Sequence, residues 1–315
     1  MWLVSEAGGC AHWRAPGKIN LYLDVLCRRE DGYHDIETIF QSVTWWDDVL
    51  VDVGNADGRI TLNCSEPELE TEDNLACRAA RLLREKSGTE QGARIWIRKR
   101  IPVGGGMAGG SADAAAVLTA LNRLWSLHYP PDTLRELALE LGSDVPFCLT
   151  GGTAAAGGRG ERLQFLPPPR GLHHAVLVFP GVVSRTADVY RHPALCPAGG
   201  PPRGENWTSR FSSVLERLQA GRMTEVLFNR LEIPVFTQYP LLREIRDFLT
   251  AAGCVAAAVS GSGSTVFGLC ATEEEVWAVC NRVRRERGWT VEAVTMWHPE
   301  YNLSTQPDDL PRMKG

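Results

Sequence analysis

A glycine-rich segment has the composition expected of a phosphate-binding loop. Residues 104–111 read GGGMAGGS, and an apolar helical pattern follows at 112–125. Because glycine has no side chain and adopts positive φ, its backbone N–H groups can approach an anion closely. The N-terminus of a helix also attracts negative charge. The segment therefore predicts a loop that binds phosphate at the start of a helix, with a flexible glycine-rich turn as the alternative.

Two familiar phosphate-binding motifs do not account for this segment. A Walker A loop requires lysine where this chain has Gly110, so that motif is excluded. A dinucleotide-binding fingerprint fits poorly, because no acidic residue closes a strand about 20 residues later. The loop is therefore expected to belong to another class of phosphate-binding protein.

Two other segments place polar groups at the starts of strands. Lys18 and Asn20 lie at the beginning of an alternating pattern at 19–26. Residues 260–265 form a second loop of small residues, which leads into a strand at 266–269. A lysine at a strand start is ordinarily just solvated, so Lys18 gains significance only from the neighbouring motifs.

Taken with residues 102–115, these segments resemble the three signature motifs of the GHMP kinase superfamily in their order and spacing. The resemblance extends from Pro16 to about Asn302. Residues 28–34, RREDGYH, and 141–147, LGSDVPF, resemble one branch in particular. That branch consists of the kinases of 4-(cytidine 5′-diphospho)-2-C-methyl-D-erythritol. The resemblance thus implies an enzyme that phosphorylates an alcohol.

The resemblance implies an α+β fold with two domains and an active site between them. The N-terminal domain would be ribosomal-protein-S5-like and bind the nucleotide, and the C-terminal domain would be ferredoxin-like and bind the substrate. Three prolines at 167–169 can continue neither helix nor sheet, and they mark the expected boundary. We therefore predict domains at 1–168 and 169–303, followed by a disordered polar tail at 304–315.

Local patterns predict the elements around the motifs. Alternating polar and apolar residues predict separate strands at 36–43 and 48–53. Apolar spacing predicts a helix at 74–86, with Thr71 or Asp73 as its N-cap. These elements would hold the glycine-rich loop against the strand that carries Lys18.

Lys18 and Asp144 are the catalytic residues that the resemblance implies. Phosphoryl transfer needs a group that accepts the hydroxyl proton and charges that stabilise the attacking oxygen. Asp144 would accept the proton, while Lys18 would orient Asp144 and stabilise the developing negative charge. A turn carboxylate that binds local N–H groups is the alternative for Asp144.

Four residues are implied to bind the alcohol substrate. Tyr33 would stack on the cytosine, an interaction worth about 1–3 kcal/mol, and His34 would hydrogen-bond the base edge. Asn20 would bind near the reacting hydroxyl, and Tyr190 would supply a second aromatic wall. The alternative is packing for Tyr33 and His34, and a plain strand-edge position for Asn20.

ATP and Mg²⁺ are the implied cofactors. Ser111 would offer its hydroxyl to a phosphate or to Mg²⁺, and it could also be a helix N-cap. The chain departs from the branch at two positions: Ala108 adds a methyl group where glycine is common, and Asp113 replaces an asparagine. The Asp113 carboxylate would either weaken ATP binding by repulsion or help to hold a cation. The residues implied to contact the nucleotide are Asn74, Lys99, Pro102, Val103, Gly104, Gly105, Gly106, Met107, Ala108, Gly109, Gly110, Ser111 and Asp113.

Composition limits the classes of partner. The 315 residues carry a net charge of −5, and the pI is near 5.9, which argues against an extended nucleic-acid surface. Nine scattered cysteines favour reduced thiols in a cytoplasm. No apolar stretch approaches the ~18 residues of a membrane span. We expect a cytoplasmic monomer or homodimer that binds ATP and a small-molecule substrate, with no nucleic-acid or membrane partner.

The expected reaction transfers the γ-phosphoryl group of ATP to the 2-hydroxyl of the cytidylyl methylerythritol, in the non-mevalonate route to isoprenoid precursors. One alternative is a related kinase that acts on homoserine, a sugar or mevalonate. Residues 28–34 argue against it. The other alternative is a non-enzymatic nucleotide-binding relative, against which the presence of both Lys18 and Asp144 argues.

Overall fold

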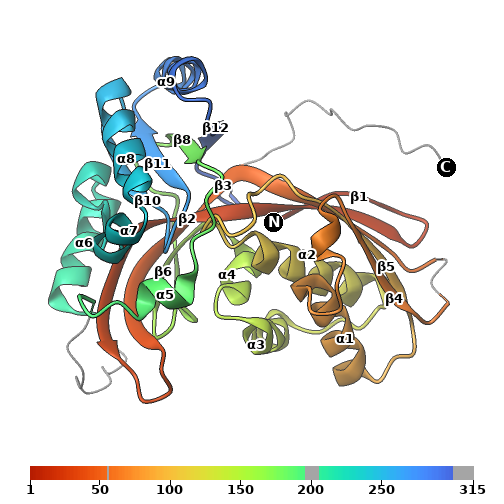
Figure 1. Ribbon diagram of the computed structural model, residues 1–315. Coiled ribbons are helices and arrows are strands. Elements are labelled where there is room, and N and C mark those ends of the chain that lie inside the picture. The colour runs from red at the N-terminus through yellow and green to blue at the C-terminus, as the bar shows by residue number, and fades with distance from the viewer. Residues whose placement is uncertain (55–56, 196–205, 301–315) are drawn as a thin grey trace.

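The larger of two β-sheets is built on one long antiparallel hairpin (Figure 1). The computed structural model describes residues 1–54, 57–195 and 206–300. The hairpin consists of β2 (Cys10–Arg28) and β3 (His34–Asp52). At one end the sheet continues in the order β1-β2-β3-β5-β4, with β1 (Trp2–Ala7), β5 (Ala93–Arg98) and β4 (Ile60–Cys64). At the other end β6 (Thr153–Gly157) pairs with β3, β7 (Arg162–Leu166) with β6, and β9 (Phe228–Asn229) with β2.

The hairpin strands are longer and more continuous than the sequence predicted. The expectation of separate strands at 36–43 and 48–53 is wrong, because β3 runs through both. The polar residues between them stay in the ladder since Asp47 is buried against Lys99. Likewise β2 begins well before Ile19, because a register shift between Pro16 and Lys18 lets the strand continue past a proline.

Four helices cover one face of the β1-β2-β3-β5-β4 part of the sheet (Figure 1). They are α1 (Leu75–Ser87), α2 (Gly109–Leu124), α3 (Pro131–Leu141) and α4 (Val145–Thr150). The α2 helix lies at the centre of this core, and its small alanine side chains allow close packing against β2, α1 and α4. Burial of this apolar surface holds the start of α2 next to the hairpin.

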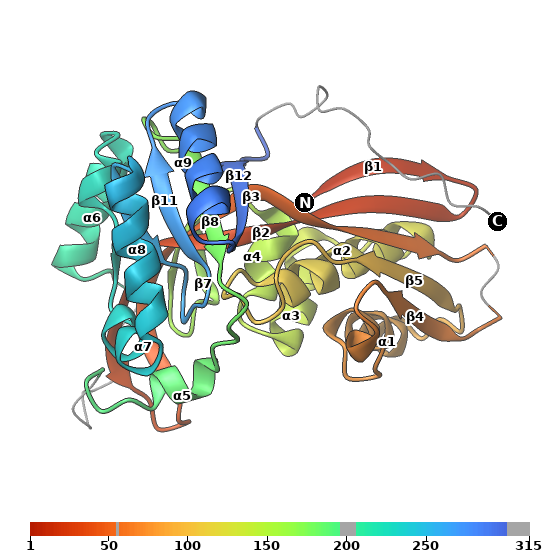
Figure 2. The ribbon, with the colours of Figure 1, turned by 45° about the horizontal axis from the view of Figure 1, so that its top comes forward.

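The smaller sheet contains four antiparallel strands in the order β10-β11-β8-β12. These are β10 (Ala256–Val259), β11 (Val266–Cys270), β8 (His174–Phe179) and β12 (Thr290–Thr295). The helices α8 (Pro240–Ala252) and α9 (Glu273–Glu286) pack on its outer face (Figure 2). The strands of this sheet and the helices that cover it follow one another in the chain as β8, α8, β10, β11, α9 and β12, which is a ferredoxin-like arrangement. The α+β expectation is therefore confirmed.

The inner face of the smaller sheet packs on the long hairpin. Leu177 and Phe267 from the smaller sheet share a core with Leu21, Tyr22 and other hairpin residues. The predicted boundary at 168/169 falls between β7 of the larger sheet and β8 of the smaller one. The division at this point remains a prediction, and β9 from the second half joins the first sheet. The predicted tail at 304–315 lies outside the described residues.

Further helical segments lie elsewhere in the described chain. They are η1 (Pro67–Leu69), α5 (Thr186–Tyr190), α6 (Ser209–Gln219), η2 (Met223–Glu225) and α7 (Glu232–Gln238). Across the part of the chain that the structure describes, no helix has both the length and the apolar character needed to cross a membrane.

Candidate active site

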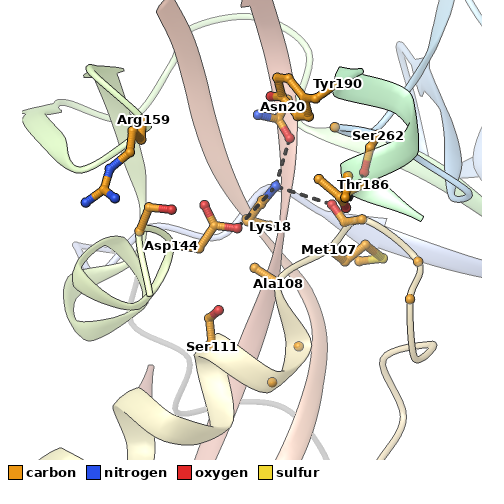
Figure 3. A pocket seen from close by; sticks show the side chains of 18 of the residues that line it. Lys18, Asn20, Met107, Ala108, Ser111, Asp144, Arg159, Thr186, Tyr190 and Ser262 are labelled. Carbon is orange, nitrogen blue, oxygen red and sulfur yellow. Dashed lines mark hydrogen bonds and ion pairs between the residues drawn. The ribbon is translucent and has the colours of Figure 1, made fainter. Parts of the chain in front are cut away.

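A cavity of about 1250 Å³ opens where the glycine-rich loop, the hairpin and α5 meet. Side chains from both halves of the chain line it (Figure 3). The lining includes Lys18, Asn20, Tyr33, His34, Asn74, Lys99, Asp113, Asp144 and Tyr190, together with every residue from Pro102 to Ser111. The residues proposed for catalysis, substrate binding and nucleotide binding are thus gathered in one place, and their individual roles stay predictions.

Lys18 projects from β2 at a point where the strand geometry is adjusted. Register shifts between β2 and β3 lie on both sides of the segment that holds Lys18 and Asn20, and such bulges re-aim side chains. The Lys18 Nζ donates to Asn20 Oδ1 at 2.9 Å and to the Gly106 carbonyl at 3.3 Å. Asn20 in turn donates to Thr38 Oγ1 at 2.8 Å. The buried ammonium is therefore held in a fixed position.

Asp144 faces Lys18 across the cavity. Asp144 is the N-cap residue of α4, but its side chain accepts no hydrogen bond there, so the alternative of a local turn carboxylate is not supported. Its Oδ2 lies 3.9 Å from Lys18 Nζ, and its side chain is 35% exposed. A carboxylate that is open to a ligand and paired with a fixed cation can accept a proton from a bound hydroxyl.

The glycine-rich loop is attached to the C-terminal half of the chain. The Ser260 hydroxyl donates to the Gly106 carbonyl at 3.1 Å, and the Thr265 N–H donates to the Gly105 carbonyl at 3.1 Å. Gly106 has φ of 74°, and a Cβ on it would lie 2.5 Å from the Ser260 carbonyl oxygen. Only glycine fits there, since any side chain would force the two loops apart.

The α2 helix starts earlier than its sequence pattern predicted. It begins at Gly109 and its N-cap is Ala108, so the alternative in which Ser111 is the helix N-cap is excluded. Ser111 lies in the first turn, and its side chain lines the cavity (Figure 3). Ala108 has φ of 56°, in the left-handed region. This conformation is natural for glycine and strained for alanine, which gives a physical reason for glycine at this position.

A buried triad of Asp47, Lys99 and Asp113 lies beside the end of the glycine-rich loop. Lys99 Nζ is 2.5 Å from Asp47 Oδ2 and 2.7 Å from Asp113 Oδ2. Asp47 Oδ1 also accepts from the backbone N–H groups of Arg100 and Ile101. Burial and the neighbouring Asp47 raise the pKa of Asp113 to about 8. The extra carboxylate of Asp113 thus holds a cation, and that cation is the ammonium group of Lys99.

Asn74 has a structural task as well as a place in the cavity lining. Its Oδ1 accepts from the Ala76 N–H at 2.9 Å, which makes Asn74 the N-cap of α1. The prediction of Thr71 or Asp73 as the cap is therefore wrong. Both amide atoms of Asn74 are used, because its Nδ2 donates to the Leu69 carbonyl at 3.0 Å. A contact of Asn74 with nucleotide remains a prediction.

At the other end of the cavity, aromatic side chains gather around the start of β3. The rings of His34 and Tyr190 lie 5.3 Å apart, so Tyr190 contacts His34 directly. Burial lowers the pKa of His34, with a further contribution from the Arg28 charge. Burial and the nearby Asp144 raise the pKa of Tyr190. Tyr33 is 56% exposed, which leaves its ring accessible to a ligand.

Metal-binding side chains do not cluster in the described part of the chain. Within residues 1–54, 57–195 and 206–300, no group of three His, Cys, Asp or Glu side chains has the arrangement of a metal site. A metal ion could still enter with nucleotide phosphates, because Mg²⁺ needs few protein ligands when phosphates supply the others. Ser111 lines the cavity, and its contact with such an ion stays a prediction.

Known proteins share both the sequence and the architecture of this chain. Residues 74–152 match the GHMP kinases N terminal domain, and residues 211–288 match the GHMP kinases C terminal domain. The 4-diphosphocytidyl-2-C-methyl-D-erythritol kinase of Pelotomaculum thermopropionicum is 44% identical over 86% of this chain and 93% of its own length. The chain belongs to this family of GHMP kinases. It is therefore an ATP-dependent kinase.

Further relatives place this GHMP kinase more closely within the superfamily. The kinase of the same name from Gloeobacter violaceus is 40% identical over 87% of the chain and 90% of its own length. A crystal structure of 4-(cytidine 5′-diphospho)-2C-methyl-D-erythritol kinase covers 90% of the chain and 98% of its own, with a TM-score of 0.74 and 37% identity. A homoserine kinase from Cytophaga hutchinsonii covers 94% of this chain and 97% of its own with a TM-score of 0.69, but at 18% identity it shows only the shared fold.

Several residues that line the site of this kinase were not found by sequence reasoning. Arg159 enters from the turn between β6 and β7, while Thr186 and Ser262 come from the C-terminal half (Figure 3). The Thr186 and Ser262 hydroxyls lie 2.8 Å apart. The small-residue loop at 260–265 was a signal for Ser262. Arg159 and Asp47 carried no such signal, because each is brought to the site by long-range strand pairing.

Proposed function

We propose that the protein transfers the γ-phosphoryl group of ATP to the 2-hydroxyl of 4-(cytidine 5′-diphospho)-2-C-methyl-D-erythritol. The reaction is a step in non-mevalonate isoprenoid precursor biosynthesis. One observation carries this proposal: the Lys18–Asp144 pair lies in the same cavity as the glycine-rich loop and the Tyr33–His34 segment. The phosphate donor and the cytidylyl alcohol therefore have separate binding regions, with the Asp144 carboxylate and the Lys18 ammonium between them.

In the proposed reaction, each of these groups has a distinct role. Asp144 takes the proton of the 2-hydroxyl as its oxygen forms a bond to the γ-phosphorus, and the bond from that phosphorus to the β–γ bridging oxygen breaks to release ADP. Lys18 stabilises negative charge on the attacking oxygen. Backbone N–H groups of residues 104–111 bind the phosphates at the start of α2. Mg²⁺, carried by the nucleotide with Ser111 as a protein ligand, would shield the phosphate charges.

The aromatic end of the cavity suits a neutral pyrimidine. Because burial lowers the pKa of His34, its imidazole is neutral near pH 7 and can both donate and accept at a base edge. The exposed ring of Tyr33 offers a stacking surface. Homoserine, galactose and mevalonate lack a base, so they would leave this region unused.

We also propose a cytoplasmic location and a monomer or homodimer. The cysteines at positions 10, 64, 77, 148, 254, 270 and 280 are thiols rather than disulfides, which suits a reducing compartment. The size of the protein in solution, measured by light scattering, tests the second part.

Product formation is the direct test of the function. The purified protein is incubated with ATP, Mg²⁺ and the cytidylyl methylerythritol, and ADP and phosphorylated product are followed by mass. We expect turnover on this alcohol, and kcat at least about 100-fold lower in Asp144→Asn, the order of magnitude for loss of a general base. Turnover on homoserine, galactose or mevalonate instead would contradict the substrate assignment. ATP binding without any ADP formation would support a non-enzymatic relative.

A further inference from the structure

Arg159 occupies a turn that is fixed beside the predicted base-binding segment. The flanking Gly158 and Gly160 have φ of 67° and 107°, and they allow a tight turn between β6 and β7. The Gly158 carbonyl accepts from the Ile36 N–H at 2.8 Å, close to the start of β3. The Arg159 N–H donates to Glu161 Oε2 at 2.6 Å. The backbone of Arg159 is thus anchored next to Tyr33 and His34.

The Arg159 side chain is held over an aromatic ring. Its guanidinium carbon lies 4.9 Å from the centre of the Tyr33 ring, within the range of a cation–π interaction. The side chain lines the cavity on the same side as Asp144, opposite Tyr190 and Thr186 (Figure 3). Arg159 therefore lies beside the aromatic end of the same cavity that holds the catalytic pair.

The charge of Arg159 is available to a ligand. No carboxylate in the described parts of the chain comes within ion-pair distance of its guanidinium. Asp31 acts on it only at longer range, because the ion pair of Asp31 is with Arg29. At the opposite end of the cavity Lys99 is occupied by two carboxylates. A half-buried guanidinium without such a partner is suited to a bidentate anion such as a phosphate.

We propose that Arg159 binds the diphosphate group of the alcohol substrate and selects alcohols linked to a nucleoside diphosphate. The inference rests on the proposed function, which places a base near Tyr33 and the reacting hydroxyl near Lys18 and Asp144. The diphosphate is the part of such a molecule that follows the nucleoside, and Arg159 lines this cavity next to Tyr33. Arg159 would thus be a substrate-binding residue that contributes to KM more than to kcat.

Ligand fragments separate this role from base binding. We would measure dissociation constants for cytidine and cytidine diphosphate by calorimetry in the wild type, Arg159→Gln, Arg159→Lys and the control Arg170→Gln, an exposed arginine outside the cavity. We expect Arg159→Gln to weaken cytidine diphosphate about 10- to 100-fold, as for a lost charge-assisted hydrogen bond, and cytidine less than about threefold. Arg159→Lys should be intermediate, and Arg170→Gln unchanged. The KM for ATP should not move.

Other results would overturn the inference in distinguishable ways. Unchanged affinities for both cytidine and cytidine diphosphate in Arg159→Gln would show that the guanidinium does not bind the diphosphate. An equal loss for cytidine and cytidine diphosphate would mean that Arg159 only positions Tyr33. If a thermal unfolding control shows that Arg159→Gln does not fold, the affinities of Arg159→Lys for cytidine and cytidine diphosphate provide the test instead. A wild type that binds neither ligand and does not turn over the cytidylyl alcohol would overturn the proposed function, and the inference with it.

Discussion

The buried triad of Asp47, Lys99 and Asp113 predicts an unusual dependence of stability on pH. Two carboxylates flank one ammonium in a region where all three side chains are almost fully buried, so the triad carries a net negative charge when both are ionised. Burial and repulsion by Asp47 raise the pKa of Asp113 from 3.8 to about 8. One Asp113 oxygen, Oδ1, also lacks a hydrogen-bond partner. The substitution Asp113→Asn removes the excess charge and keeps the shape.

The sign of the effect follows from proton binding. A carboxyl group whose pKa is higher in the folded protein binds more protons in the folded state between the two pKa values, here between about 4 and 8. The wild type therefore loses stability as pH rises through this window, at up to about 1.4 kcal/mol per pH unit. The asparagine variant has no such proton to lose. Its advantage over the wild type should therefore grow by about 1–3 kcal/mol between pH 5.5 and pH 7.5.

Chemical unfolding at several pH values measures this difference. Tryptophan fluorescence would follow wild type, Asp113→Asn and the control Asp132→Asn, in which a side chain 84% exposed to solvent is changed. A gap between wild type and Asp113→Asn that stays constant from pH 5.5 to pH 8.5 would refute the reasoning. So would a destabilised Asp113→Asn at pH 8. Above pH 8, where Asp113 is ionised, the KM for ATP should be lower in Asp113→Asn than in the wild type, because the substitution removes a negative charge near the glycine-rich loop.

Three further predictions concern the loop and the catalytic pair. Ala108→Gly should raise the free energy of unfolding by about 1 kcal/mol, because it relieves a left-handed alanine; an unchanged or lower value would contradict this. Gly106→Ala should raise the KM for ATP and lower the midpoint of thermal unfolding, since its Cβ would collide with the Ser260 carbonyl. Normal ATP kinetics in that variant would argue against a fixed loop. Lys18→Met should lower kcat about 100-fold or more with little change in ATP affinity, and an unaltered kcat would exclude its role at the attacking oxygen.

Sequence reasoning was most successful where chemistry depends on short contiguous motifs. The glycine-rich loop and the segments around Lys18, Tyr33 and Asp144 each carry their signal locally, and the structure brings them into one cavity. Helix and strand limits were less predictable. Ala108 looks like part of a loop, but a left-handed residue at that point lets α2 begin immediately after it. The continuous β3 depends on a distant partner for Asp47, which local periodicity does not register.

Contacts between distant segments account for the remaining differences. Arg159 lies in an unremarkable turn of the sequence, and only the pairing of β6 with β3 brings it to Tyr33. Asp113 was recognised as an unusual carboxylate, but its partner could not be identified, because Lys99 and Asp113 meet through packing of α2 on the sheet. Both cases involve charges whose effect depends on what is buried next to them.

The hydrogen bonds from Ser260 and Thr265 to the glycine-rich loop have a consequence for how the protein can be divided. The conformation of a loop in the first half is determined partly by groups from the second. A fragment that ends near residue 168 would lose these two hydrogen bonds and the backbone of Ser260, which packs closely against Gly106. Such a fragment would have to order its own loop on meeting ATP, and that entropy cost would weaken the affinity. The first half of the chain therefore does not by itself contain all the groups that fix the conformation of this loop.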